Sequence, residues 1–124
     1  MAREERRAAY RLGRRAEAFC VLLLFLRGYR ILARGYRTPF GEIDIVARRG
    51  GLVALIEVKA RGSVARAAEA VSPGQRARVA KAARLFLAKN PALAHLDVRF
   101  DAMLVAPWRL PKHVPDAWRP EAPR

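Results

Sequence analysis

The chain has 124 residues, 52% of them hydrophobic, which is enough for one domain with its own core and too little for two. Its 25 lysines and arginines outnumber 11 acidic residues, and the net charge of +14 indicates a polyanionic partner, either nucleic acid or an anionic membrane surface. One cysteine, Cys20, excludes an internal disulfide framework and a cysteine-based metal site, and we expect a cytoplasmic protein.

A hydrophobic run over residues 18–26 follows an arginine-rich start and superficially resembles a signal peptide. The run is too short to span a bilayer, Glu17 and Arg27 bound it, and no small-residue cleavage site follows, so export is not expected. We expect instead an amphipathic helix that becomes buried toward its end and terminates at Gly28. Its expected core face repeats at helical spacing: Leu12, Ala16, Phe19, Leu23 and Leu26.

The next strand is expected over residues 29–37, with Gly35 at a turn or bulge because glycine tolerates left-handed backbone geometry. Residues 41–61 then form two β-rich runs that meet at Gly50 and Gly51. A two-residue loop at these glycines predicts a hairpin in which Asp44 faces Glu57.

One face of this hairpin is expected to be charged and the other apolar, because side chains alternate along a strand. The charged face would hold Glu42, Asp44, Glu57 and Lys59, with Glu42 opposite Lys59; the apolar face would hold Ile43, Ile45, Ile56 and Val58. Two opposed carboxylates, with Cβ atoms roughly 5 Å apart, destabilise a sheet unless something compensates. Mg²⁺ held by the carboxylates is one explanation, with Lys59 holding a phosphate or orienting water. An ordinary solvated face of mixed charge is the other.

Residues 61–71 lack a strong period and are expected to form a mobile loop or a short helix. Ser72 as N-cap, Pro73 at the first helical position and Gln75 in a capping box then predict a helix to about Lys89. Its expected core face comprises Val79, Ala82, Ala83 and Phe86. Its basic residues form either a solvated face or a phosphate-tracking surface, and the net charge favours the second: Arg76, Lys81, Arg84 and Lys89.

Residues 96–105 alternate well enough for a strand, with Phe100 and Ala102 on one face and Arg99 and Asp101 on the other. We expect a last edge strand over residues 108–114, a turn over residues 116–118 and frayed residues from Pro120 onward. His95 and His113 show no ligand spacing, and neither is expected to be catalytic.

Asp44 followed by Glu57-Val58-Lys59 resembles the Asp…(Asp/Glu)-x-Lys signature of the restriction-endonuclease-like nuclease superfamily. Further stretches over about residues 10–119 are similar to the YraN family of small bacterial proteins, whose fold resembles that of archaeal Holliday junction resolvases. These stretches are Gly13-Arg14-Arg15-Ala16-Glu17, Gly28-Tyr29-Arg30-Ile31-Leu32, Arg37, Gly41-Glu42-Ile43-Asp44, Glu57-Val58-Lys59-Ala60-Arg61 and Arg99-Phe100-Asp101.

The resemblance implies a single restriction-endonuclease-like α/β domain, with a mixed central sheet flanked by helices, that hydrolyses DNA phosphodiesters with Mg²⁺ or Mn²⁺. Asp44, Glu57 and the Val58 carbonyl would hold the metal, Lys59 would orient water or stabilise developing charge, and Glu17 would help at the metal. A branched or flapped DNA substrate and a homodimer are implied, without a small-molecule cofactor or a membrane partner. The expected nucleic-acid contacts are Arg14, Arg37, Arg61, Gln75, Arg76, Lys81 and Arg84.

Three alternatives stay open from the residues. Glu17 equally fits an ion pair with Arg14 or Arg15. Gln75 stands where the YraN family usually has lysine, so it serves only as a cap or else lies near the site. The whole domain could also be a non-catalytic nucleic-acid-binding module, and a peripheral membrane protein is a third function consistent with the charge.

Overall fold

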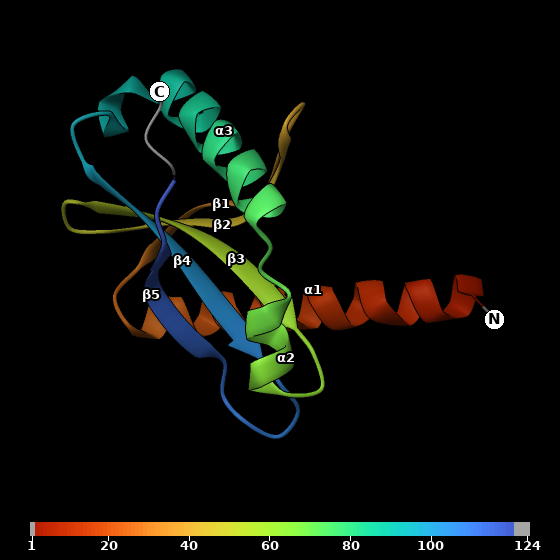
Figure 1. Cartoon of the computed structure of the whole chain (residues 1–124). Helices are drawn as coiled ribbons and strands as arrows, with labels where there is room; N and C mark the ends of the chain where they lie inside the picture. The colour runs from red at the N-terminus through yellow and green to blue at the C-terminus, as the bar shows by residue number, and fades with distance from the viewer. Residues whose placement is uncertain (1, 121–124) are drawn as a thin grey trace.

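The computed structural model describes residues 2–120, with the side chains of all of these except residues 2 and 4–12. The helices are α1 (Ala2–Leu26), α2 (Val64–Glu69), α3 (Pro73–Lys89) and a short 3-10 turn, η1 (Pro91–Leu93). The strands are β1 (Arg30–Thr38), β2 (Gly41–Arg49), β3 (Leu52–Ala60), β4 (Asp97–Val105) and β5 (Lys112–Trp118). The strands form one mixed sheet with helices on both faces (Figure 1), so the predicted α/β class and flanked mixed sheet are confirmed.

The sheet has the order β1-β2-β3-β4-β5. β1, β2 and β3 form an antiparallel meander, β3 and β4 are parallel, and β5 is antiparallel to β4. Parallel neighbours require a crossover connection, and α2 and α3 supply it between β3 and β4. This crossover brings the start of α3 over the open end of the β2–β3 hairpin, the end away from its turn.

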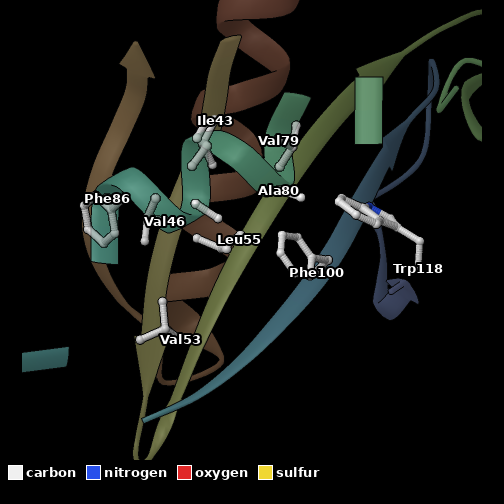
Figure 2. Close-up of a cluster of buried hydrophobic side chains, with 11 residues drawn as sticks. Ile43, Val46, Val53, Leu55, Val79, Ala80, Phe86, Phe100 and Trp118 are labelled. Atoms are coloured by element: carbon white, nitrogen blue, oxygen red, sulfur yellow. The ribbon is translucent and has the colours of Figure 1, made fainter. Parts of the chain in front are cut away.

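Each face of the sheet has its own core. On the α3 face, Val79 and Phe86 of the helix pack over Val46 and Leu55 of the hairpin (Figure 2). On the α1 face, Cys20 and Leu24 pack over a second cluster: Ile45, Ala47, Ala54, Ile56 and Met103. Because both faces of β3 are covered, its residues 53–56 are buried without alternation, as is typical of a strand with a parallel neighbour.

The predicted first helix is confirmed, but its core face is partly wrong. Ala16, Cys20 and Leu24 face the sheet at a spacing of four residues, whereas Phe19 and Leu26 are exposed; the side chain of Leu12 lies outside the described residues. Gly28 ends the helix as predicted, at φ 90°. Within the described chain, every helix is too short or too polar to cross a membrane.

The region between β3 and β4 follows the sequence pattern closely. Residues 61–71 contain the short helix α2, capped by Ser63, so the short-helix alternative is confirmed. α3 begins at Pro73, where the Ser72 hydroxyl accepts the Gln75 backbone N–H at 3.3 Å. The predicted core face of α3 is confirmed, since all four residues are buried: Val79, Ala82, Ala83 and Phe86.

The last strand differs from the prediction. β5 begins at Lys112 and runs to Trp118, whereas a strand over residues 108–114 and a turn over 116–118 were expected. Pairing with β4 decides this, because Trp118 lies opposite Phe100 and the Asp116 backbone N–H donates to the Asp101 carboxylate at 3.0 Å. The fraying expected from Pro120 onward falls, apart from Pro120 itself, on residues 121–124, which lie outside the described chain.

Candidate functional site

Strands β2 and β3 carry the candidate acids Asp44 and Glu57, and the pairing of the two strands ends next to these residues. The β2–β3 ladder runs from Arg49–Leu52 to Ile45–Ile56, which confirms the predicted register up to that pair; the ladder ends before the expected pair of Asp44 and Glu57. One residue further on, the Asp44 carboxylate accepts a hydrogen bond from the Val58 backbone N–H at 2.8 Å. The Asp44 side chain therefore replaces the backbone hydrogen bond between the strands at the point where they separate, which we call the fork.

The pairing expected between Glu42 and Lys59 is wrong. The Glu42 carboxylate lies 3.6 Å from the Arg37 guanidinium on β1, and the Lys59 ammonium lies 3.5 Å from Glu57 on its own strand. Beyond the fork, β2 pairs only with β1, so Glu42 has Arg37 as its cross-strand neighbour.

The alternation of faces along β2 is also interrupted at this level. Ile43 packs in the cluster under α3 and Ile45 in the cluster under α1, although a regular strand would place both on one face. Asp44 lies between them, and Gly35 at the same level of β1 has φ 58°, as its predicted turn or bulge requires. The expectation of one charged and one apolar hairpin face therefore holds only for part of the hairpin.

Glu57 is a buried carboxylate whose oxygens lack hydrogen bonds to the described residues. Its side chain is 4% exposed, and neither oxygen has a hydrogen-bond partner in that part of the chain. Burial raises the pKa of Glu57, against the opposing charges of Lys59 and Arg76. The ionic partner of Glu57 is Lys59, 3.5 Å from one oxygen, and a buried carboxylate with no closer polar contact in the described chain is suited to receive a further cation.

Asp44 is held in a similar electrostatic environment. Burial raises its pKa from 3.8 to about 6; the Val58 N–H and Lys59 oppose the rise, and Glu57 and Glu17 add to it. Glu17 and Asp44 also contribute, after burial, to raising the pKa of Cys20 to about 12. The charges of Glu17 and Glu57 thus both act on Asp44, and a divalent cation at the fork would relieve this repulsion.

The raised pKa of Asp44 makes the stability of the metal-free protein depend on pH. A folded-state pKa above the unfolded value stabilises the fold below 3.8, and this contribution is lost as the pH rises through about 6. Complete loss of this contribution lowers the free energy of unfolding by about 3 kcal/mol. We expect urea denaturation between about pH 4 and pH 7 to show this decrease in wild type and not in Asp44→Asn. An equal pH dependence in both proteins would contradict the assignment, and the exposed Asp97→Asn serves as control.

Glu17 reaches the site from α1. Its carboxylate lies 3.4 Å from Nε of Arg34 on β1, an ion-pair partner that neither of the sequence alternatives named. Glu17 and Asp44 line a pocket of about 280 Å³, together with Arg14, Arg37 and Val58. Two of the predicted nucleic-acid contacts, Arg14 and Arg37, are therefore brought to the candidate acids.

A second pocket, of about 450 Å³, reaches Asp44 from the α3 side. Gln75 and Arg78 line it from the first turns of the helix, along with Glu42 of β2. Sequence reasoning missed Arg78, although its position three residues after Gln75 places both on one side of the helix. Gln75 therefore lies near the site, and its backbone N–H is the group that the Ser72 cap accepts.

A family comparison covers this part of the chain. Residues 16–105 match the family described as "Uncharacterised protein family UPF0102". The chain belongs to the UPF0102 family. A UPF0102 protein of Parvibaculum lavamentivorans is 56% identical over 113 residues, 91% of this chain and 85% of that protein. A UPF0102 protein of Bradyrhizobium diazoefficiens is 54% identical over 114 residues, which cover 92% of this chain and 86% of that protein. The resemblance to the YraN family is thereby confirmed at the level of the family.

The remaining predicted contacts of this UPF0102 protein line other pockets. Arg61 lines an apolar pocket of about 400 Å³ with Phe19 and Trp108, which shares Ala60 with the pocket of Glu17 and Asp44. The basic residues of α3 line another pocket beside the end of β5: Arg76, Lys81 and Arg84. Among the described residues, no three or more histidine, cysteine or acidic side chains are grouped as a ready metal site. Any metal here would rest on few protein ligands.

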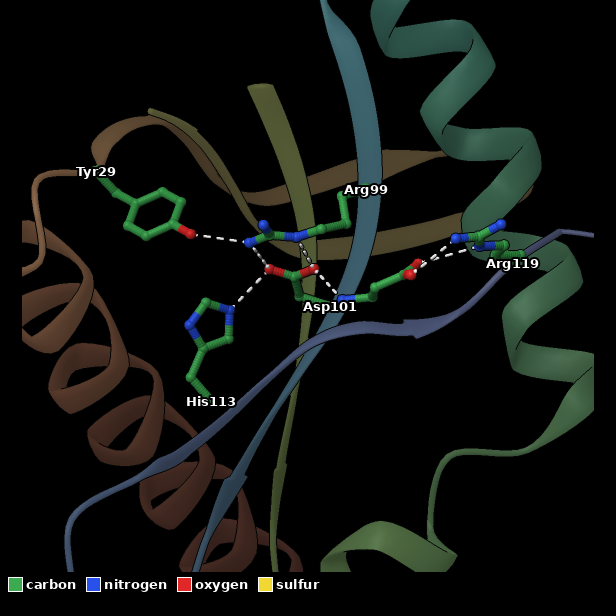
Figure 3. Close-up of polar contacts among 6 residues, drawn as sticks. Tyr29, Arg99, Asp101, His113 and Arg119 are labelled. Atoms are coloured by element: carbon green, nitrogen blue, oxygen red, sulfur yellow. Dashed lines mark hydrogen bonds and ion pairs between the residues drawn. The ribbon is translucent and has the colours of Figure 1, made fainter. Parts of the chain in front are cut away.

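The UPF0102 protein also contains a buried ionic cluster that sequence reasoning did not identify. Asp101 is fully buried and accepts hydrogen bonds from Arg99, from His113 at 2.7 Å and from the Asp116 backbone (Figure 3). Arg99 donates in addition to the Tyr29 hydroxyl at 2.8 Å. Burial would raise the pKa of Asp101, but the bonds from His113 and Arg99 hold it below its ordinary value. The cluster joins β4, β5 and the end of α1.

Proposed function

We propose that this UPF0102 protein is a metal-dependent nuclease that hydrolyses phosphodiester bonds of DNA. The observation that carries the proposal is the buried Glu57 carboxylate, which has the Lys59 ammonium 3.5 Å away, no closer hydrogen bond within the described chain, and a charge that helps to raise the pKa of Asp44. The motif formed by these residues resembles that of restriction-endonuclease-like nucleases, including archaeal Holliday junction resolvases. The net charge of +14 favours a polyanionic substrate.

The donor set fits Mg²⁺ or Mn²⁺. Mg²⁺ is usually bound by one or two carboxylates, with water and substrate phosphate completing its shell. Asp44 keeps one oxygen outside its bond to Val58, and both oxygens of Glu57 lack hydrogen bonds within the described chain. In an extended strand, the N–H and C=O of one residue point toward the same neighbour, so the Val58 carbonyl is directed to the fork as well.

The bound metal would polarise the phosphate and lower the pKa of a coordinated water. Lys59 has its ammonium group 3.5 Å from Glu57, where it stabilises negative charge that develops on a phosphate oxygen. Glu17 holds Arg34 and adds negative charge beside Asp44, which favours the metal. Arg14 and Arg37 line the pocket that contains Asp44 and would position a neighbouring phosphate.

The test is cleavage of end-labelled four-way junction, flap, single-stranded and duplex DNA in Mg²⁺, in Mn²⁺ and in EDTA, with Asp44→Asn in parallel. We expect products in either metal, none in EDTA, and none from Asp44→Asn, whose folding is checked by circular dichroism. A branched substrate and a homodimer, as in resolvases, predict paired cuts in the junction. Equal products from both proteins would contradict a role for Asp44.

Gln75 favours a second candidate, a nucleic-acid-binding module without turnover. It stands where the YraN family usually has lysine; its backbone N–H donates to the Ser72 hydroxyl that caps α3, and the residue lines the pocket beside Asp44. A neutral amide supplies less phosphate stabilisation than an ammonium group. DNA binding with equal affinity by wild type and Asp44→Asn, without cleavage by either protein, would establish this alternative.

A further inference from the structure

A pocket of about 440 Å³ lies between α3 and the end of β5, and its charged residues all have one sign. Arg76, Lys81 and Arg84 line it from α3, and Trp118 and Arg119 line it from the other side. Arg119 is paired with Asp116 at 3.1 Å (Figure 3), but both side chains are substantially exposed, so that pair is weak. Four cations around one concave surface select an anion.

Two hydrogen-bond donors of this pocket are buried without partners among the described residues. They are Nε of Arg76 and the indole Nε1 of Trp118. Trp118 is 7% exposed and is fixed in place, because its ring packs on Phe100 with a centroid distance of 4.3 Å (Figure 2). Native proteins rarely leave buried N–H groups unpaired, and such a group calls for an acceptor from outside the chain. These donors accordingly leave room for an acceptor from outside the chain, and the four cations around them favour an anion.

We propose that this pocket binds a phosphate group of a nucleic-acid strand, with the Trp118 indole and the Arg76 guanidinium donating to its oxygens. Lys81, Arg84 and Arg119 balance its charge. Both nitrogens are buried, so the exposed cationic side chains around the pocket must shift before a phosphate oxygen can reach them. Nucleic acid as the source of the phosphate rests on the proposed function; recognition of the phosphate itself does not.

The pocket adjoins the candidate metal site through Arg76. The charge of this residue acts on Glu57, while its side chain lines the phosphate pocket. One side chain, that of Arg76, thus links the pocket to the candidate metal site. This assigns the pocket to a phosphate other than the one that is cleaved.

The test follows the two indole N–H signals by NMR in ¹⁵N-labelled, full-length Asp44→Asn in EDTA, where hydrolysis is absent. The ligands are inorganic phosphate and a single-stranded DNA of about twelve nucleotides. We expect the Trp118 signal to shift with both ligands, at lower concentration with DNA. Trp108 is fully exposed, does not line the pocket and serves as the internal reference. An unmoved Trp118 signal at saturation would overturn the proposal, and a shift with phosphate alone would overturn nucleic acid as its source.

Two variants add an affinity measurement by fluorescence anisotropy. Trp118→Phe keeps the ring packing and removes the donor, so we expect about tenfold weaker DNA binding, with Trp108→Phe unchanged. Arg84→Ala, on the exposed side of α3, is expected to lower the dependence of log K on log salt by about 0.7. Unchanged affinity in both variants would reject the pocket. Because the assays contain no metal, their outcome is independent of whether the wild type cleaves DNA.

Discussion

Glu57→Gln is expected to abolish metal-dependent cleavage while making the metal-free protein more stable. The substitution removes a metal-binding carboxylate, and metal ions stabilise transition-state charge by several kcal/mol, so a loss of at least about a hundredfold in rate follows. Burial raises the pKa of Glu57, so the ionised group opposes folding above that pKa. At about pH 8 we expect the free energy of unfolding to rise by about 1 kcal/mol, because losing the contact with Lys59 offsets part of the gain.

Urea denaturation at about pH 8 and about pH 5, with and without Mg²⁺, measures both effects. Added Mg²⁺ should stabilise the wild type and leave Glu57→Gln unchanged. The matched control is Glu69→Gln, an exposed residue on α2, which should retain both cleavage and Mg²⁺ stabilisation. A variant that is less stable than wild type without metal would show that Glu57 supports the fold, and the metal interpretation would lose its main support.

Asp101→Asn is expected to produce the largest loss of stability, about 3–5 kcal/mol. The new amide side chain would have nearly the same shape, but the charge that balances Arg99 would be gone. Asp101 accepts several hydrogen bonds, and the amide would place an NH₂ donor where one carboxylate oxygen now accepts. The Arg99 side chain is only 20% exposed, so solvent compensates it poorly. Loss of the cluster should also loosen β5, which is bonded to Asp101 through His113 and Asp116.

Guanidinium denaturation followed by tryptophan fluorescence measures this difference, since Trp118 lies at the end of β5. The pKa of Asp101 is lowered, so its contribution is present above the ordinary value of 3.8 and is lost as the pH falls through the folded-state value. The difference in the free energy of unfolding between wild type and Asp101→Asn should therefore become smaller at acid pH. Asp97→Asn, exposed on the same strand, should stay within about 0.5 kcal/mol of wild type. A comparable small change in Asp101→Asn would contradict the structural role.

The sequence alone determined the features that depend on local chemistry. Gly50 and Gly51 define the hairpin and its register, because a two-residue loop needs backbone conformations that glycine adopts freely. Ser72 and Pro73 define the start of α3 through a side-chain cap and a fixed φ. The candidate acids Asp44 and Glu57 were likewise found from the motif that places them on paired strands.

Only the tertiary structure decided how those residues are surrounded. Three features depend on how β2 separates from β3 between the helices on the two faces of the sheet. They are the fork at Asp44, the pairing of Glu17 with Arg34 and the lack of close hydrogen bonds at Glu57. The bond from Arg99 to Tyr29 joins residues 70 positions apart, and no local pattern encodes it. Alternation along a strand predicts a face correctly only while pairing is regular. Burial, partners and the pKa of a carboxyl group are set by contacts between distant segments, and these exist only once the sheet and both helical layers are assembled.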